Sequence, residues 1–526
     1  MTSWGDRLMT TARPRLAQGV AVRPEDVTVA EPISYSSFVG GLNLADGPED
    51  TPPNAAVYAV DMDVSRADEL VRAPGITTIQ TQTTRVLLNL FNHPTLDYTA
   101  ELVAIDAPWL GYSPVGDYTS LTWANAAIAG VGGGSGARWN GRAIGGLLIF
   151  SDGTAKVYTR AAAAATVTDV SAQLKAADTF ASFAGRTYAG AITPAGGTYQ
   201  GLGIAWSGSS GTISDFTGTN SGAELLVQDS KDADKIISLN SIGFDVMGIL
   251  CRRSLWAAYK TGVASRPADF RPRFQSIGCV SRETAQLTPG GITFLSDEGV
   301  MNYDINSVTM ISRAINGSLL PLDTGQLQNY RAAYHPVRQR YYLMTPTELW
   351  VYTFPTPETP GYWTKRGVLL GNIIAYGVLT GSPFGAASQM GFVDDAVLGY
   401  LRLGREDPTS TQYFEAPLFT PTWRTSSALK GETTQQVTTL GFEIEYTSTA
   451  TADIQLRTMD SQGLWTGSTP VSKTLLSTGG LLKRVKIQYI WTGMNTGIEI
   501  AITNGFPKIA RITQLVQAAG PSLRSV

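Results

Sequence analysis

At 526 residues, the chain is too long for one ordinary hydrophobic core, so two or three domains are expected. Its hydrophobic content of 43% supports a folded interior, whereas its charged content of 16% is low. The formal net charge of −3 argues against a general nucleic-acid binder, which would be basic, although it is compatible with a channel wall along which DNA slides.

Residues 1–35 are predicted to form an extended arm, because prolines interrupt them and they lack hydrophobic periodicity. Such an arm either orders against a partner or is a disordered tail. The first thirty residues contain charged side chains and no apolar signal region, so no signal peptide is predicted. No run of about 18 apolar residues occurs, so we expect no membrane span and synthesis in the cytoplasm.

Residues 38–75 form a distinctive entry segment. The pair Gly40-Gly41 permits a tight turn, and the prolines between residues 48 and 53 keep the chain out of helix and sheet. Asn54 is expected to cap a short helical turn over residues 55–59. The alternation in residues 60–64 predicts a strand whose two carboxylates, from Asp61 and Asp63, face outward.

The entry segment resembles the opening of the tail nozzle, or tail accessory factor, proteins of short-tailed bacteriophages. The likeness lies in the Gly-Gly-Leu-Asn turn at 40–43, the proline-rich bend, the aspartate-bearing strand and the Arg-Ala-Pro-Gly close at 72–75. The sequence departs from the family pattern at Ala59, where an Asn is usual, and at residues 68–70. The strong resemblance covers about forty residues.

From about residue 86 to 404 the chain repeats an aromatic-rich β-hairpin with Asp-Gly or Asp-Asp turns. The seven examples span residues 101–112, 147–158, 202–216, 254–262, 292–303, 341–352 and 391–400. They start roughly 38 to 55 residues apart, close to the length of a β-propeller blade. Asp-Gly turns suit tight hairpins, and the aromatic side chains would fill the wedge between blades.

These hairpins predict an all-β fold with a β-propeller, which has seven blades, or six if the outer pair of hairpins shares one blade by strand exchange. A β-sandwich or a β-solenoid is the alternative. Residues 161–165 and 170–177 are expected to form a short helix between blades. After residue 405, longer alternating strands at 441–446, 452–457, 483–489 and 497–503 predict a β-sandwich-like domain. The predicted domains are therefore the arm 1–35, the propeller 36–405 and the C-terminal domain 406–526.

Catalytic and cofactor motifs are scarce. His93 and His335 are the two histidines, and neither belongs to a metal-binding or hydrolytic pattern. Cys251 and Cys279 make no disulfide framework and are expected to remain reduced thiols. The sequence lacks a Walker-type loop, and residue 66 is arginine where a calcium loop starting at Asp61 would need glycine. We therefore predict no enzyme, no cofactor and no metal.

A carbohydrate-binding or glycoside-hydrolysing propeller is the main rival. That chemistry needs two carboxyl groups about 5–10 Å apart. The turns 151–153 and 296–299 are similar to incomplete Asp-box turns, although Ser-Asp-Gly is also good turn chemistry.

A basic stretch lies between residues 252 and 282, which contain seven lysine and arginine residues and a single acidic residue, Asp269. The candidate interface residues in it are Arg252, Arg253, Arg266, Arg271 and Arg273. Three interpretations stay open: a solvated face with arginines packed on aromatics, a contact with a neighbouring subunit, or a surface facing DNA inside a ring.

The resemblance implies a structural protein of the virion tail. Such proteins form a homohexameric ring below the portal and its adaptor, continue the DNA channel, retain the genome until ejection and carry tail fibres or tailspikes. DNA would pass through without sequence-specific binding. The expected contacts with the adaptor or a neighbouring subunit lie in the arm and in the entry segment, at Phe38, Gly40, Gly41, Leu42, Asn43 and Leu44. Another virion component, such as a tail hub or a decoration protein, is a further possibility.

Overall fold

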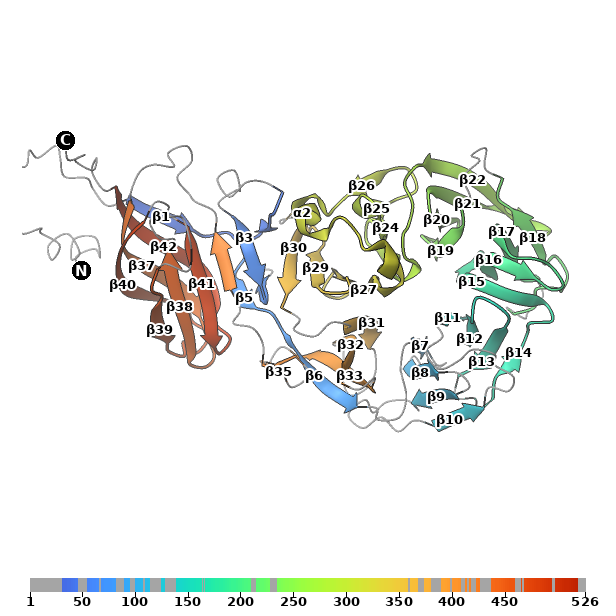
Figure 1. Cartoon of the computed structure of the whole chain (residues 1–526), viewed down its shortest axis with the longest axis horizontal. Helices are drawn as coiled ribbons and strands as arrows, with labels where there is room; N and C mark the ends of the chain where they lie inside the picture. The colour runs from blue at the N-terminus through green and yellow to red at the C-terminus, as the bar shows by residue number, and fades with distance from the viewer. Residues whose placement is uncertain are drawn as a thin grey trace, which may run out of the picture. The chain divides into compact units, whose positions relative to one another are not determined.

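The protein is an all-β chain in the computed structural model shown in Figure 1. The structure describes residues 31–45, 54–65, 68–81, 89–94, 100–106, 109–113, 124–127, 139–162, 164, 166–209, 214–227, 234–357, 360–367, 373–379, 389–397, 400–407, 412–413, 416–417, 422–425, 437–458, 465, 468–493 and 497–518. Within these ranges no helix is long and apolar enough to cross a membrane. Residues 1–30 of the predicted arm lie outside the described residues.

The chain forms two compact units. Unit 1 comprises Met1–Pro74, Pro355–Gly367 and Leu418–Val526, and unit 2 comprises Gly75–Phe354 and Val368–Pro417. This division differs from the predicted boundaries, because the entry segment folds with the C-terminal strands. Strand β3 (Ala55–Val60) pairs antiparallel with β36 (Thr422–Thr425), and β5 (Leu70–Arg72) pairs antiparallel with β42 (Lys508–Ala518). These pairings join residues more than 350 positions apart in the sequence.

Unit 2 contains five successive four-stranded sheets, each an antiparallel meander of consecutive strands (Figure 1). The first three are β7 (Asn89–Pro94), β8 (Ala100–Asp106), β9 (Trp109–Ser113) and β10 (Ala124–Ala127); β11 (Asn140–Ile144), β12 (Leu147–Ser151), β13 (Val157–Ala161) and β14 (Thr168–Asp169); and β15 (Leu174–Phe183), β16 (Arg186–Pro194), β17 (Gln200–Trp206) and β18 (Gly222–Leu225). The next two are β19 (Ile236–Ser241), β20 (Val246–Cys251), β21 (Ser254–Val263) and β22 (Arg266–Gln275); and β23 (Gln286–Thr288), β24 (Gly291–Ser296), β25 (Gly299–Tyr303) and β26 (Val308–Met310).

Short helical turns and further strands complete unit 2. The turns are η2 (Arg282–Thr284), η3 (Arg313–Ile315), α2 (Asn316–Leu319) and η4 (Thr324–Asn329). The strands are β27 (Arg331–His335), β28 (Arg340–Met344), β29 (Leu349–Thr353), β31 (Ile373–Leu379), β32 (Gln389–Val397), β33 (Tyr400–Asp407), β34 (Gln412–Tyr413) and β35 (Ala416–Pro417). Strand β6 (Gly75–Thr81), the first of the unit, pairs antiparallel with β33. The two ends of unit 2 therefore share one sheet.

Apolar cores lie between successive sheets of unit 2. One core combines β15–β18 with β19–β22 and contains Trp206 and Trp256. The ring of Trp206 lies 6.4 Å from that of Phe270, which belongs to the next sheet. A second core joins β19–β22 to β23–β26. Two further cores join β7–β10 to β11–β14 and β11–β14 to β15–β18. Aromatic side chains thus fill the space between neighbouring sheets, as the hairpin repeat predicts.

Unit 1 contains two groups of paired strands. The first has the order β30 (Tyr362–Arg366), β3, β36, β41 (Ile498–Asn504), β38 (Ala452–Thr458) and β39 (Val471–Leu475), with β2 (Gly41–Leu42) parallel to β3. The second has the order β4 (Met62–Val64), β5, β42, β37 (Val437–Thr447) and β40 (Lys483–Gly493), with β1 (Glu31–Tyr35) on β42. The four alternating strands predicted in the C-terminal region are confirmed.

Two predicted helical segments are wrong. Residues 55–59 belong to β3, which is hydrogen-bonded to both β36 and β30, so this tertiary pairing overrides the helix propensity of its alanines. Residues 174–177 begin strand β15, and the side chains of Leu174 and Ala177 pack in an apolar core. Burial in that core requires the extended form of the segment.

Candidate interface sites

The entry segment is anchored inside unit 1. Backbone hydrogen bonds connect Gly40 to Asn54 and Asn43 to Ala56. The Phe38 ring makes an edge contact with the Trp423 ring at 5.9 Å, and only 1% of Phe38 is exposed. Burying an aromatic ring of this size stabilises the fold by several kcal/mol, roughly 3–5 by truncation. The segment therefore fixes the start of β3 against β36.

The glycines of this segment permit a close approach of backbones. Gly41 has a φ of 58°, and a Cβ atom there would lie 2.6 Å from Cβ of Tyr362 and 2.8 Å from the carbonyl oxygen of Trp363. A Cβ atom at Gly40 would lie 2.6 Å from the carbonyl oxygen of Asn54. Because real side chains do not tolerate such distances, these positions need glycine for packing within the chain.

The two carboxylates expected to face outward are buried, so that prediction is wrong. Asp61 is 0% exposed and Asp63 is 2% exposed. Asp61 has a φ of 55°, and its Oδ1 accepts a hydrogen bond from the Gly367 amide at 2.9 Å. Asp63 pairs with Arg366, which donates from Nη2 at 3.0 Å. The strand alternation breaks at Asp61, which turns both carboxylates toward β30.

Of the six candidate contacts in the entry segment, Phe38 and Leu42 leave almost no surface for a partner, because they are 1% and 3% exposed. Asn43 and Leu44 are half-buried, and Asn43 Oδ1 accepts a hydrogen bond from the Ala45 amide at 3.1 Å. A contact with a partner at these two residues stays a prediction.

The basic stretch lies on the hairpin β21–β22 and the turns beside it, where its arginines have partners within the chain. Arg252 binds both carboxylate oxygens of Asp297, at 2.6 and 2.9 Å, and this pairing raises the pKa of Arg252. Arg271 pairs with Asp269 at 2.7 Å and lies over the Tyr259 ring. Arg266 pairs with Glu224 at 3.1 Å.

The remaining arginines of the set are placed similarly. Arg273 donates to the carbonyl of Ile305 and to the Asn306 side chain, both at 2.9 Å. The backbone amide of Arg253 donates to Asp234. The acid pairs of Arg252, Arg266 and Arg271 and the neutral acceptors of Arg273 therefore account for these four side chains without a ligand. A subunit or DNA contact is untested.

A cleft of about 470 Å³ lies in unit 2. It is lined by the middle of β15, the start of β19, the η2 region and η4, with Asp178, Lys235, Arg282 and Glu283 among its residues. Burial raises the pKa of Asp178, and the Tyr199 hydroxyl hydrogen-bonds to its Oδ2 at 3.1 Å. The volume of the cleft lies in the range of small-molecule binding sites.

The second carboxylate of this cleft is neutralised. Glu283 forms ion pairs with Arg282 at 3.3 Å and with Arg331 at 2.9 Å. Arg282 also donates to the backbone carbonyl of Asp178 at 2.6 Å. A glycoside hydrolase needs one carboxylic acid whose proton is available and one carboxylate. The two arginines favour a structural role for Glu283.

Residues 151–156 form an ordinary turn stabilised by an aspartate side chain, which accounts for the Ser-Asp-Gly sequence without an Asp-box. Asp152 Oδ1 accepts hydrogen bonds from the amides of Thr154, Ala155 and Lys156.

His335 is fully buried, and its Nδ1 accepts a hydrogen bond from the Arg338 amide. Within the described ranges, no group of three or more metal-ligating side chains is brought together.

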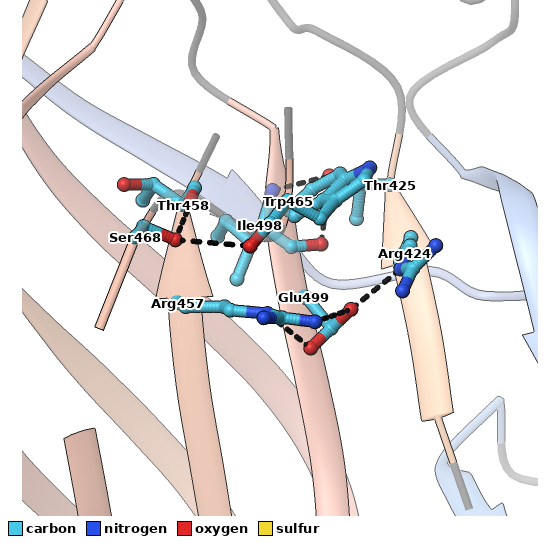
Figure 2. Close-up of polar contacts among 8 residues, drawn as sticks. All are labelled: Arg424, Thr425, Arg457, Thr458, Trp465, Ser468, Ile498 and Glu499. Carbon is cyan, nitrogen blue, oxygen red and sulfur yellow. Dashed lines mark hydrogen bonds and ion pairs between the residues drawn. The ribbon is translucent and has the colours of Figure 1, made fainter. Parts of the chain in front are cut away.

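Sequence reasoning missed a row of side chains on unit 1 in which Glu499 lies between Arg424 and Arg457 (Figure 2). Its members come from three strands that are neighbours in the sheet but not in the sequence. The alternating pattern of β38 and β41 predicts which residues share a face, but it carries no signal for the register between strands.

No protein-family model and no curated protein matches the sequence. Among solved structures, the chain is similar to the RRP9 WD40 repeats, with 10% identity and a TM-score of 0.42, over 64% of this chain and 99% of that one. It is also similar to Raptor from Chaetomium thermophilum, with 12% identity and a TM-score of 0.38, over 66% of this chain and 30% of that one. The matched part is thus less than a third of the length of Raptor.

Proposed function

We propose that this chain is a non-enzymatic structural protein of a short-tailed bacteriophage virion, forming the tail nozzle. The observation that supports the proposal best is the entry segment 38–75, which resembles that family. Its glycines and buried aspartates serve packing against β3 and β30, as a structural junction requires.

We further propose that unit 2 is a seven-bladed β-propeller and that the C-terminal strands form a β-sandwich. The continuous series of cores between successive sheets supports a fan of blades. The pairing of β6 with β33 supports closure of the last blade by the first strand of the unit.

In the proposed assembly, six copies form a ring below the portal and adaptor, continue the DNA channel and carry tail fibres or tailspikes. The low charged content of 16% supports a chain that covers much of its surface with other copies. Half-buried Asn43 and Leu44 are the candidate contacts that remain in the entry segment. DNA would pass the near-neutral wall without sequence-specific binding.

Electron microscopy of the purified chain, alone and mixed with portal–adaptor complexes, tests this proposal. We expect rings with sixfold symmetry that dock onto the complexes, and the same rings in the tail of the virion. Leu44→Asp should reduce docking and leave the circular dichroism spectrum unchanged. A chain that stays monomeric at high concentration and does not bind the complexes would overturn the proposal.

The second candidate is a carbohydrate-binding or glycoside-cleaving propeller. The cleft lined by Asp178 favours it, because burial raises the pKa of this carboxyl group in a site of suitable size. Release of reducing sugar by the wild type, lost in Asp178→Asn, would favour this candidate over the nozzle.

A further inference from the structure

A row of four side chains crosses unit 1 from strand to strand. Tyr58 on β3 lies opposite Arg424 on β36. Arg424 and Arg457, the latter on β38, both lie opposite Glu499 on the intervening strand β41. Side chains directly opposite each other in neighbouring strands are close enough to interact. Figure 2 shows the Glu499 carboxylate between the two guanidinium groups.

The hydrogen bonds of this row engage both oxygens of Glu499 and leave N–H donors of the two arginines over. Arg457 donates from Nε to Oε1 of Glu499 at 2.5 Å and from Nη2 to Oε2 at 3.0 Å. Arg424 donates from Nε to Oε2 at 2.5 Å. Among the residues that the structure describes, both terminal nitrogens of Arg424 and Nη1 of Arg457 have no acceptor. The free Nη1–Nη2 end of Arg424 matches the two oxygens of a planar anion.

Aromatic rings hold Arg424 in place. Its Cζ lies 4.4 Å from the centre of the Tyr58 ring and 5.5 Å from the centre of the Trp465 ring. A guanidinium fixed by rings and by a carboxylate loses less conformational entropy when it binds an anion. The site is also reachable, because the side chains of Arg424 and Arg457 are 25% and 20% exposed and Tyr58 is 39% exposed.

The charge of the site selects the ligand. Two guanidinium groups and one carboxylate leave a net charge of +1. A carboxylate carries one negative charge and has two coplanar oxygens, whereas a phosphate monoester carries nearly two. We propose that Arg424, Arg457, Tyr58 and Trp465 form a binding site for one carboxylate group that is attached to an apolar or aromatic body. A side-chain carboxylate of a protein partner and a chain's C-terminal carboxylate are the two sources of this chemistry.

Ligand-observed saturation-transfer NMR on the full chain, with benzoate as the probe, tests the proposal. We expect benzoate to bind at about the millimolar level, and benzyl alcohol, which lacks the carboxylate, to bind at least about tenfold more weakly. Arg424→Gln should weaken benzoate binding by about tenfold. Phenyl phosphate that binds much more tightly than benzoate would overturn the charge-matching argument.

Arg484→Gln is the matched control. Arg484 on β40 also pairs with two glutamates, Glu443 and Glu445, and its side chain is 58% exposed. Benzoate binding should be unchanged in this variant. Equal losses in the two variants would show non-specific attraction to arginine and would sink the proposal, as would unchanged binding in Arg424→Gln.

A second variant separates binding from folding. Arg424→Lys keeps the charge near Glu499 but removes the planar end that receives the carboxylate. It should fold like the wild type by circular dichroism and still lose benzoate binding.

Two blocked peptides distinguish the sources of the carboxylate. One ends in phenylalanine with a free C-terminus, and the other places an aspartate before an amidated end. Failure of both peptides to compete with benzoate would contradict a protein ligand. The outcome is independent of ring formation, so it can fail without the nozzle proposal failing.

Discussion

Arg366 donates from Nη2 to Oδ2 of Asp63 across 3.0 Å, and both side chains are 2% exposed. The two residues are 303 positions apart in the sequence, so the pair joins the entry segment to β30. A buried charge whose partner is removed costs several kcal/mol, whereas a well-packed apolar pair in its place is often tolerated.

Arg366→Met should therefore destabilise unit 1 by about 3–5 kcal/mol, because it removes the guanidinium that pairs with the buried Asp63 carboxylate. The double variant Asp63→Leu/Arg366→Met should recover most of that loss. Hydrogen exchange measured by mass spectrometry on peptides that cover β3, β4 and β30 reports the local unfolding free energy. Equal destabilisation in the single and double variants would show that packing, and not the charge pair, dominates here.

Gly41→Ala tests whether the entry turn is fixed by close packing. The new Cβ would meet Tyr362 and the backbone of Trp363, which adds about 1–3 kcal/mol to the cost of a left-handed backbone. Gly479→Ala is the control in the same unit, since Gly479 has a φ of 62° and its Cβ would meet nothing within 4 Å. In denaturant unfolding, the midpoint concentration of Gly41→Ala should lie well below that of Gly479→Ala. Similar midpoints for the two variants would contradict the packing argument.

Local patterns predict most of the hairpins and the C-terminal strands, but residues 254–262 belong to the single strand β21 and the described part of residues 202–216 contains only one strand, β17. The turn at 296–299 and the alternation in 452–457 specify β24–β25 and β38 because their signals lie within a few residues. The outward placement of Asp63 is wrong because its partner, Arg366, is remote and gives no local signal. The sequence likewise does not show that the entry segment joins the C-terminal strands, because β3 and β5 pair with β36 and β42 across hundreds of residues. The row of Arg424, Glu499 and Arg457 likewise depends on register between strands.

The buried thiols predict a loss of stability in alkaline solution. Burial raises the pKa of Cys279 from its ordinary value of 9.0 to about 12, and it also raises the pKa of Cys251. Above pH 9 the unfolded chain releases these protons and the folded chain keeps them. Stability is therefore full below pH 9 and falls as the pH rises toward 12, by about 1.4 kcal/mol per pH unit for each thiol.

Thermal unfolding between pH 7.5 and 9.8 measures this effect, and comparison with a variant that lacks both thiols separates it from the tyrosines that begin to titrate in this range. The midpoint should fall with pH in the wild type and fall less in Cys251→Ala/Cys279→Ala, after each is compared with its own value at pH 7.5. Both thiols should resist alkylation in the native chain and react after denaturation. A pH dependence that the double variant leaves unchanged would assign the loss to other groups.

Arg271 on the basic hairpin is expected to contribute little to stability. Its side chain is 63% exposed and its partner Asp269 is 36% exposed, so solvent screens the 2.7 Å pair. Arg271→Ala should lower the unfolding free energy by less than about 1 kcal/mol. Its effect on assembly is a separate matter, and analytical ultracentrifugation of the variant measures it. Weaker association at unchanged stability would support the hairpin as a contact between subunits, because a surface arginine that matters only in the oligomer must face another copy. Arg484→Ala, equally exposed but on β40, provides the control, and association that is unaffected by Arg271→Ala would leave the hairpin as a solvated face.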